Sequence, residues 1–168
     1  MRRFARTLGM ALACLALLGM ASAVLAESKF KNIKALKGKS DDEIKKAMSE
    51  WNKSLGVKCL GCHKNLKTPD LDDHPAKEAT RAMVKLTDEA NAAIPGDVKI
   101  TCWGCHRGNL KVGKVDDNVP VEKGKEEVSK KMKEMTVSLG QKFSAELKGG
   151  SITCGTCHHG AAKIPAKP

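Results

Sequence analysis

Hydrophobic residues recur along three stretches of the chain at intervals of three and four positions, the spacing of one face of an α-helix. A capping box of Ser40 and Glu43 precedes the first stretch, and Pro75 suits the first position of the second. No stretch longer than a few residues alternates as a strand does, so the pattern predicts an all-α fold with little or no β structure. The stretches are Ile44, Ala47, Met48, Trp51 and Leu55, ended by Gly56; Ala76, Ala79, Met83, Leu86, Ala90 and Ala93, ended by Pro95 and Gly96; and Val128, Met132, Met135, Leu139, Phe143 and Leu147, ended by Gly149 and Gly150.

A fourth apolar run at the N-terminus has a different character. Three arginines within the first six residues precede an Ala/Leu/Met-rich stretch over residues 7–24, and Val24-Leu25-Ala26 suits cleavage. This arrangement predicts a signal peptide over residues 1–26, export to the periplasm, and a single mature domain over residues 27–168. Because the run is short and no second one follows, no stable membrane span is expected after its removal. Cys14 within the run keeps a lipid anchor open as an alternative.

The six cysteines of the mature chain fall into three pairs, and a histidine follows each pair directly. C-x-x-C-H is the attachment motif of c-type haem, in which two thiols on one turn reach the porphyrin vinyl groups and the imidazole lies under the iron. A disulfide framework does not require those histidines, and zinc sites combine two such pairs or add spaced histidines. The sequence therefore predicts three covalently attached haems. The attachment residues are Cys59, Cys62, Cys102, Cys105, Cys154 and Cys157, and the proximal iron ligands are His63, His106 and His158.

Composition and charge agree with a core filled by something other than side chains. The 168 residues include two Trp, three Phe and no Tyr, a small supply of large apolar groups that three porphyrins would supplement. The net charge of +11 falls to +8 when the three leader arginines are removed. No basic stripe with interleaved aromatic residues is present, so nucleic-acid binding is not expected. A lysine-rich face instead suits redox partner proteins that are acidic or membrane-bound.

The second and third motifs belong to an internal repeat, in which residues 81–108 align without a gap with residues 133–160. Met83 then falls on Met135, and each precedes the first cysteine of its motif by nineteen residues. Met48 stands eleven residues before the first motif. The repeat predicts three helix–loop–motif units over about residues 40–66, 75–110 and 121–160, with a polar connector over residues 111–125.

Three irons need three distal ligands, and only His74 and His159 lie outside the motifs, so three bis-histidine haems are impossible within one chain. His159 adjoins a proximal histidine and could reach only a neighbouring haem. Methionine sulfur is an established distal ligand in cytochromes c. One methionine on an apolar stripe usually packs in a core, but three at matched places favour ligation. The predicted distal ligands are Met48, Met83 and Met135, with Met132 as the alternative at the third haem and His74 at the first or second.

The stretches M-S-E-W-N-K-S-L-G-V-K-C-L-G-C-H and D-D-H-P-A-K-E-A-T-R-A-M resemble the cytochrome subunit of photosynthetic reaction centres and its non-photosynthetic relatives. The likeness spans about residues 40–160. It implies an all-helical fold wrapped around haems, electron transfer, and axial roles for Met48, Met83 and Met135. The chain has three motifs where that subunit commonly has four, and it lacks the lipobox of many such subunits, so we expect a freely diffusing relative.

These features predict a periplasmic electron carrier that is not an enzyme. One alternative is a small multihaem reductase or peroxidase, which needs an open iron with polar groups above it. Another is a bound subunit of a membrane electron-transfer complex. Lys77, Arg81 and Lys99 are candidates for pairing with haem propionates.

Overall fold

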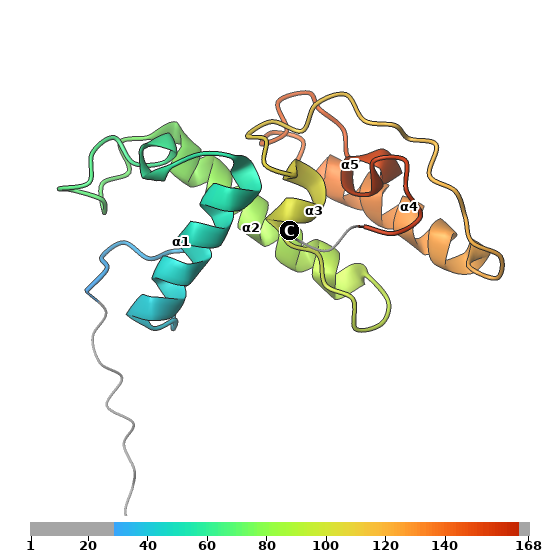
Figure 1. Ribbon diagram of the computed structural model, residues 1–168, viewed down its shortest axis with the longest axis horizontal. Helices are drawn as coiled ribbons and strands as arrows, with labels where there is room; N and C mark the ends of the chain where they lie inside the picture. Colours follow the sequence, from blue (N-terminus) through green and yellow to red (C-terminus); the bar gives the residue numbers. More distant parts are fainter. Residues whose placement is uncertain (1–28, 165–168) are drawn as a thin grey trace, which may run out of the picture.

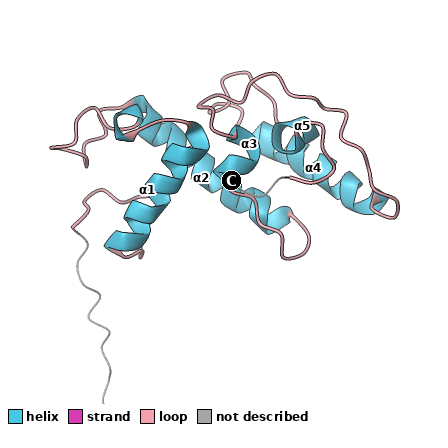
Figure 2. Cartoon of the chain, in the orientation of Figure 1, coloured by secondary structure: helices cyan, strands magenta, loops and turns pink. Residues whose placement is uncertain are grey.

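The computed structural model describes residues 29–164, and this part of the chain consists of helices and loops without a strand (Figure 1). The prediction of an all-α fold is confirmed over these residues (Figure 2). The expected signal peptide over residues 1–26, with Cys14, lies outside the described residues. The elements are α1 (Asp41–Leu55), the short 3-10 helix η1 (Cys59–Gly61), α2 (Pro75–Ala93), α3 (Cys102–His106), α4 (Glu126–Lys142) and α5 (Cys154–His158).

The ends of α1 and the start of α2 follow the local signals of the sequence. Ser40 accepts a hydrogen bond from the backbone of Glu43, whose side chain in turn accepts one from the backbone of Ser40. Gly56 ends α1 in the left-handed region with φ 64°. Pro75 is the first residue of α2, where its missing N–H costs no helical hydrogen bond.

One helix ends earlier than the sequence predicts, and one motif differs in local structure from the other two. The third apolar stripe predicts a helix that continues to Gly149, but α4 ends at Lys142. Phe143 follows as the C-cap and is only 4% exposed, so burial of its ring turns the chain out of the helix and leaves residues 143–149 in turns. The first C-x-x-C-H motif begins on a 3-10 turn, whereas the other two lie on α-helices.

The short helix α3 links the two halves of the structure because it packs against both α1 and α5 (Figure 1). Helix α2 packs against α4, so the second and third repeat units lie side by side through both of their helices. The core between them consists of Ala90, Ile94, Ile100, Leu139 and Phe143.

A close backbone contact joins α1 to the loop after α3. The Gly108 N–H donates to the Ser54 carbonyl at 2.8 Å. A Cβ atom at Gly56 would lie 2.0 Å from the Gly108 carbonyl oxygen, so only glycine fits at that position. This contact sets the distance between the first and second motifs.

The connector between α3 and α4 wraps over the third motif. Asp117 accepts hydrogen bonds from the Gly155 N–H at 2.9 Å and from the Thr153 hydroxyl. A Cβ atom at Gly155 would lie 2.4 Å from the Asp116 carbonyl oxygen. The acidic pair in the connector therefore holds the N-terminal end of α5, a contact that the sequence pattern did not indicate.

Candidate functional site

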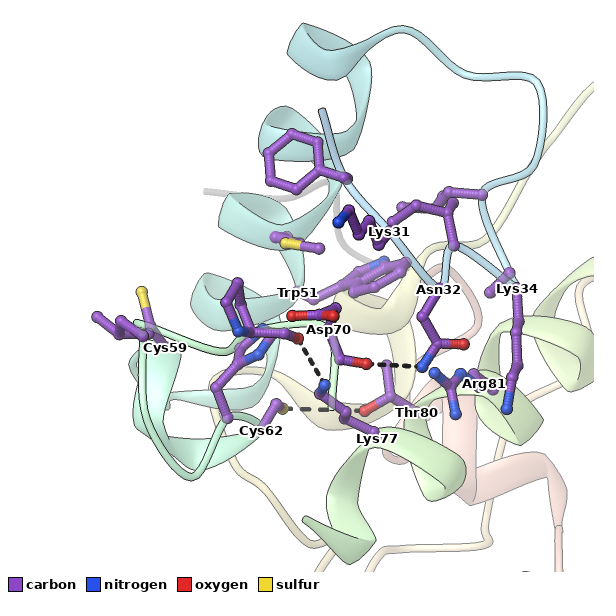
Figure 3. Close-up of a pocket in the computed structure, with 18 of the residues that line it drawn as sticks. Lys31, Asn32, Lys34, Trp51, Cys59, Cys62, Asp70, Lys77, Thr80 and Arg81 are labelled. Carbon is purple, nitrogen blue, oxygen red and sulfur yellow. Dashed lines mark hydrogen bonds between the residues drawn. The ribbon is translucent and has the colours of Figure 1, made fainter. Parts of the chain in front are cut away.

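A cavity of about 460 Å³ opens beside the first motif, and its walls bring together the four residues predicted for the first haem. Cys59, Cys62 and His63 line it from the motif, and Met48 lines it from α1, together with the indole of Trp51. Figure 3 shows Cys62 directed toward Thr80 of α2, with Trp51 at the centre of the group and Cys59 at its edge. The volume lies within the range of cofactor sites, roughly 300–1,000 Å³.

Cations dominate the polar side chains of this cavity. Lys77 and Arg81 line it from α2, and Lys29, Lys31 and Lys34 from the N-terminal segment, against one carboxylate, that of Asp70. This balance suits an anionic group such as the propionates of a haem. Lys99, the third lysine or arginine predicted to face a propionate, is not among the residues that line this cavity and donates to the Asn91 carbonyl at 2.7 Å.

Ion pairs tie the N-terminal segment over this cavity. Asp72 binds Arg81 at 2.7 Å and Lys34 at 2.8 Å, and Asn32 donates to the Asp70 carbonyl at 2.7 Å. The hydrogen bonds from Arg81, Lys34 and Asn32 hold the pKa of Asp72 far below its usual range. The carboxylate stays charged at all ordinary pH values and keeps residues 29–36 against α2.

His106 and His158 have the same hydrogen bond at matched positions. Nδ1 of His106 donates to the Asn109 carbonyl at 3.0 Å, and Nδ1 of His158 donates to the Ala161 carbonyl at 3.0 Å. A proton held at Nδ1 leaves Nε2 with a free lone pair, which is the form in which histidine binds a metal. Burial also lowers the pKa of His106, and this favours the neutral imidazole.

His63 differs from the other two motif histidines. Its Nδ1 is buried without a hydrogen-bond partner. Burial and the neighbouring Lys77 ammonium lower its pKa, while the nearby Pro69 carbonyl opposes them. The lowered pKa favours the neutral ring, the form that binds iron.

The second and third motifs face each other. All six cysteines of residues 29–164 are free thiols, and Sγ of Cys105 lies 2.8 Å from Sγ of Cys157. The Cys157 sulfur and burial together raise the pKa of the Cys105 thiol. The sulfurs that would hold the porphyrins of the second and third motifs therefore include a pair in direct contact.

Two residues that the motif does not specify join the second and third motifs reciprocally. Arg107 donates through Nη2 to the carbonyls of Cys157 at 3.3 Å and His158 at 3.2 Å. His159, which occupies the matched position in the repeat, donates through Nε2 to the Cys105 carbonyl at 3.0 Å. Both residues adopt left-handed backbone, with φ 47° and 50°. Each of the two helices α3 and α5 is thus contacted by the residue that directly follows the other, as in a local two-fold arrangement. In the sequence, only the matched positions of Arg107 and His159 in the repeat could have indicated these contacts.

Comparison with known proteins addresses the family directly. The sequence pattern of the photosynthetic reaction centre cytochrome C subunit family matches residues 18–122, which is more than half of the chain. The chain belongs to this family. No curated protein and no solved structure matches it. The match covers the first two motifs of the cytochrome and ends before the third. This match confirms the resemblance inferred from the motifs. Members of the family are haem c electron carriers.

The predicted distal methionines of the cytochrome lie in different settings. Met48 shares the first cavity with His63, whereas Met83 lies half-buried on α2, outside the residues that line this cavity. Met132 and Met135 are both half-buried and both pack against the core cluster. The structure thus brings together the predicted ligand pair of the first haem, and Met132 and Met135 both remain candidates at the third.

The two histidines outside the motifs have other partners in the cytochrome. Nδ1 of His74 accepts a hydrogen bond from the Ala76 N–H at 3.2 Å and caps α2. Its proton therefore lies on Nε2, the nitrogen that would otherwise approach an iron. Nε2 of His159 is bonded to the Cys105 carbonyl. Methionine is the stronger distal candidate on this geometry.

Among residues 29–164, no group of three or more His, Cys, Asp or Glu side chains is arranged to hold a metal ion by itself. Nor does any helix in this part of the cytochrome have the length and apolar character to cross a membrane.

Proposed function

We propose that the protein is a periplasmic electron carrier with three c-type haems, one at each C-x-x-C-H motif. Membership of the reaction-centre cytochrome family supports haem c and electron transfer. The observation that carries the proposal is the first cavity, where Met48 and His63 lie in the same walls as the two cysteines. This is the donor set of a Met/His cytochrome c.

Different residues would attach, ligate and orient each haem, which supplies one-electron iron chemistry when bound. Both thiols of a motif would hold the porphyrin through thioethers, and Nε2 of the adjacent histidine would bind the iron. At the second and third motifs, the Nδ1–H···O=C bonds orient the imidazole and increase its basicity. At the first, Trp51 and Ile33 would shield the bound group from water, and Met48 would supply a sulfur ligand, the type that raises the reduction potential.

The test is expression in a host that matures c-type haem, followed by intact-protein mass spectrometry and a pyridine haemochrome assay. Three haem increments are expected. Changing both cysteines of one motif to alanine removes one increment, and each of the three pairs behaves alike. A protein that carries haem at fewer than three motifs contradicts the proposal.

Ligation is tested separately by near-infrared magnetic circular dichroism of the oxidised protein. Methionine-ligated, bis-histidine and high-spin haems have distinct charge-transfer bands. We expect three Met/His signals, of which Met48→Ala, Met83→Ala and Met135→Ala each remove one. If the third signal survives in Met135→Ala and disappears in Met132→Ala, Met132 is the ligand. A high-spin band from the unmodified protein would favour the enzyme alternative.

A further inference from the structure

The mouth of the first cavity is bordered by two segments that carry lysine and no carboxylate. Residues 29–39 contain five lysines and residues 57–69 contain three, with no Asp or Glu in either segment. Both segments line the same cavity, and all eight lysines are exposed. Within residues 29–164, only Lys34 and Lys39 of the eight form ion pairs. The other six form no ion pair in this part of the chain; Lys29 and Lys31 of these line the cavity, and Lys37, Lys58, Lys64 and Lys67 lie beyond it on the same two segments.

Exposed leucines lie among these lysines. Leu60, inside the first motif, is 60% exposed, and Leu66 and Leu71 in the following loop are 58% and 49% exposed. Leu66 also lines the cavity. An apolar centre with a charged border is the anatomy of a protein–protein interface in which the charges steer the encounter.

The first motif is also the most open of the three. Cys59 is exposed, whereas Cys105 and Cys157 are half-buried against each other. Arg107 and His159 hold the second and third motifs face to face. A partner that exchanges electrons by direct contact thus has its shortest approach at the first motif.

We propose that these leucines and lysines, here termed the rim, form the docking face for an acidic one-electron carrier protein. The proposal rests on the proposed function and names the partner class of its first haem site. One electron passes between the partner and the first haem iron, so that one is oxidised as the other is reduced, with no bond made or broken. Charge complementarity selects the partner, because a surface rich in Asp and Glu meets six unpaired lysines. A lipid headgroup offers negative charge but does not itself donate an electron, so an acidic redox protein fits this site better.

The experiment uses the haem-loaded protein and a reduced flavodoxin, an acidic one-electron protein, as the probe. The rim variant Lys58→Glu/Lys64→Glu/Lys67→Glu is compared with the control variant Lys123→Glu/Lys130→Glu/Lys131→Glu. The control lysines are also exposed, change the net charge by the same amount, and lie around the start of α4, at the opposite end of the molecule (Figure 1). Stopped-flow absorbance measures the second-order rate of haem reduction.

At low ionic strength, the rim variant should react at least about tenfold more slowly than the unmodified protein, because local electrostatic fields change association rates by ~10–10³. The control variant should react at most about threefold more slowly. The difference should vanish near 1 M salt, where the screening length is about 3 Å. Equal slowing of both variants, or of neither, overturns the proposal. If the rim variant keeps the flavodoxin rate but loses binding to phosphatidylglycerol vesicles, the rim is a membrane contact and the proposal is wrong.

Haem content separates failure of docking from failure of the proposed function. If the unmodified protein and both variants carry the same haem content and only the rate prediction fails, the docking face is wrong while the haem assignment stands. If the unmodified protein carries no haem at the first motif, the proposed function fails first. A neutral variant, Lys58→Gln/Lys64→Gln/Lys67→Gln, should have a rate between those of the unmodified protein and the rim variant.

Discussion

Substitution of Gly56 by alanine tests the contact that joins the first motif to the second. The new Cβ would lie 2.0 Å from the Gly108 carbonyl oxygen and 2.9 Å from its carbonyl carbon. The α1–α3 junction must therefore open, and the 2.8 Å hydrogen bond from Gly108 to Ser54 is strained or lost. The left-handed φ of 64° adds a second cost, because alanine is disfavoured there.

Gly96→Ala is the matched control. Its φ is 82°, so alanine pays a similar backbone cost of about 1 kcal/mol, but a Cβ there meets no atom within 4 Å. Overpacking adds about 1–3 kcal/mol at Gly56. The two variants should differ by about 2 kcal/mol in the free energy of unfolding, and by about 6–8 °C in Tm.

Thermal unfolding of the haem-loaded variants, followed by far-ultraviolet circular dichroism, measures this difference. Haem content is determined for each sample, because loss of a haem would lower the Tm by itself. If Gly56→Ala and Gly96→Ala unfold within about 2 °C of each other with full haem content, the close approach of Gly56 to Gly108 is wrong.

Three further predictions concern single contacts. Arg107→Gln removes the charged hydrogen bonds to the Cys157 and His158 carbonyls and should lower the free energy of unfolding in urea by about 2 kcal/mol. The exposed control Lys130→Gln should leave this free energy unchanged. Equal urea midpoints for the two variants would contradict the reciprocal contact. Asp117→Ala removes the hydrogen-bond acceptor at the start of α5, so it should lower the free energy of unfolding by about 1 kcal/mol and speed hydrogen exchange of the Gly155 amide. The control Asp97→Ala should leave that exchange rate unchanged. Unaltered exchange in Asp117→Ala would refute the cap. The pKa of Asp72 is lower in the folded protein than in the unfolded chain, so in acid the unfolded chain binds the proton more readily. The stability that this carboxylate contributes is therefore complete above about pH 5 and is lost as the pH falls. Asp72→Asn should therefore flatten the loss of stability between about pH 5 and pH 2 in a series of melting curves, and a slope equal to that of the unmodified protein would show that Asp72 carries no such linkage.

The features that could be predicted from the sequence are local ones. The capping box of Ser40 and Glu43, the left-handed Gly56 and the opening Pro75 each depend on residues within one helical turn, so their outcome needs no knowledge of the rest of the fold. The C-x-x-C-H motifs are local in the same sense, since one turn of chain places two thiols and an imidazole together. The end of α4 was mispredicted because burial of Phe143 against α2, a distant contact, outweighed the helical pattern.

The tertiary structure alone decided how the three motifs stand relative to one another. The facing of the second and third motifs depends on Arg107 and His159 reaching across about fifty residues of chain. The position of the N-terminal segment beside the first motif depends on Asp72, which binds both Lys34 and Arg81. Hydrophobic periodicity records which face of a helix is buried but not which distant segment covers it, because many partners bury the same apolar area equally well. The sequence therefore determined which cysteines and histidines stand together in each motif, whereas the division into one open and two paired motifs required the fold.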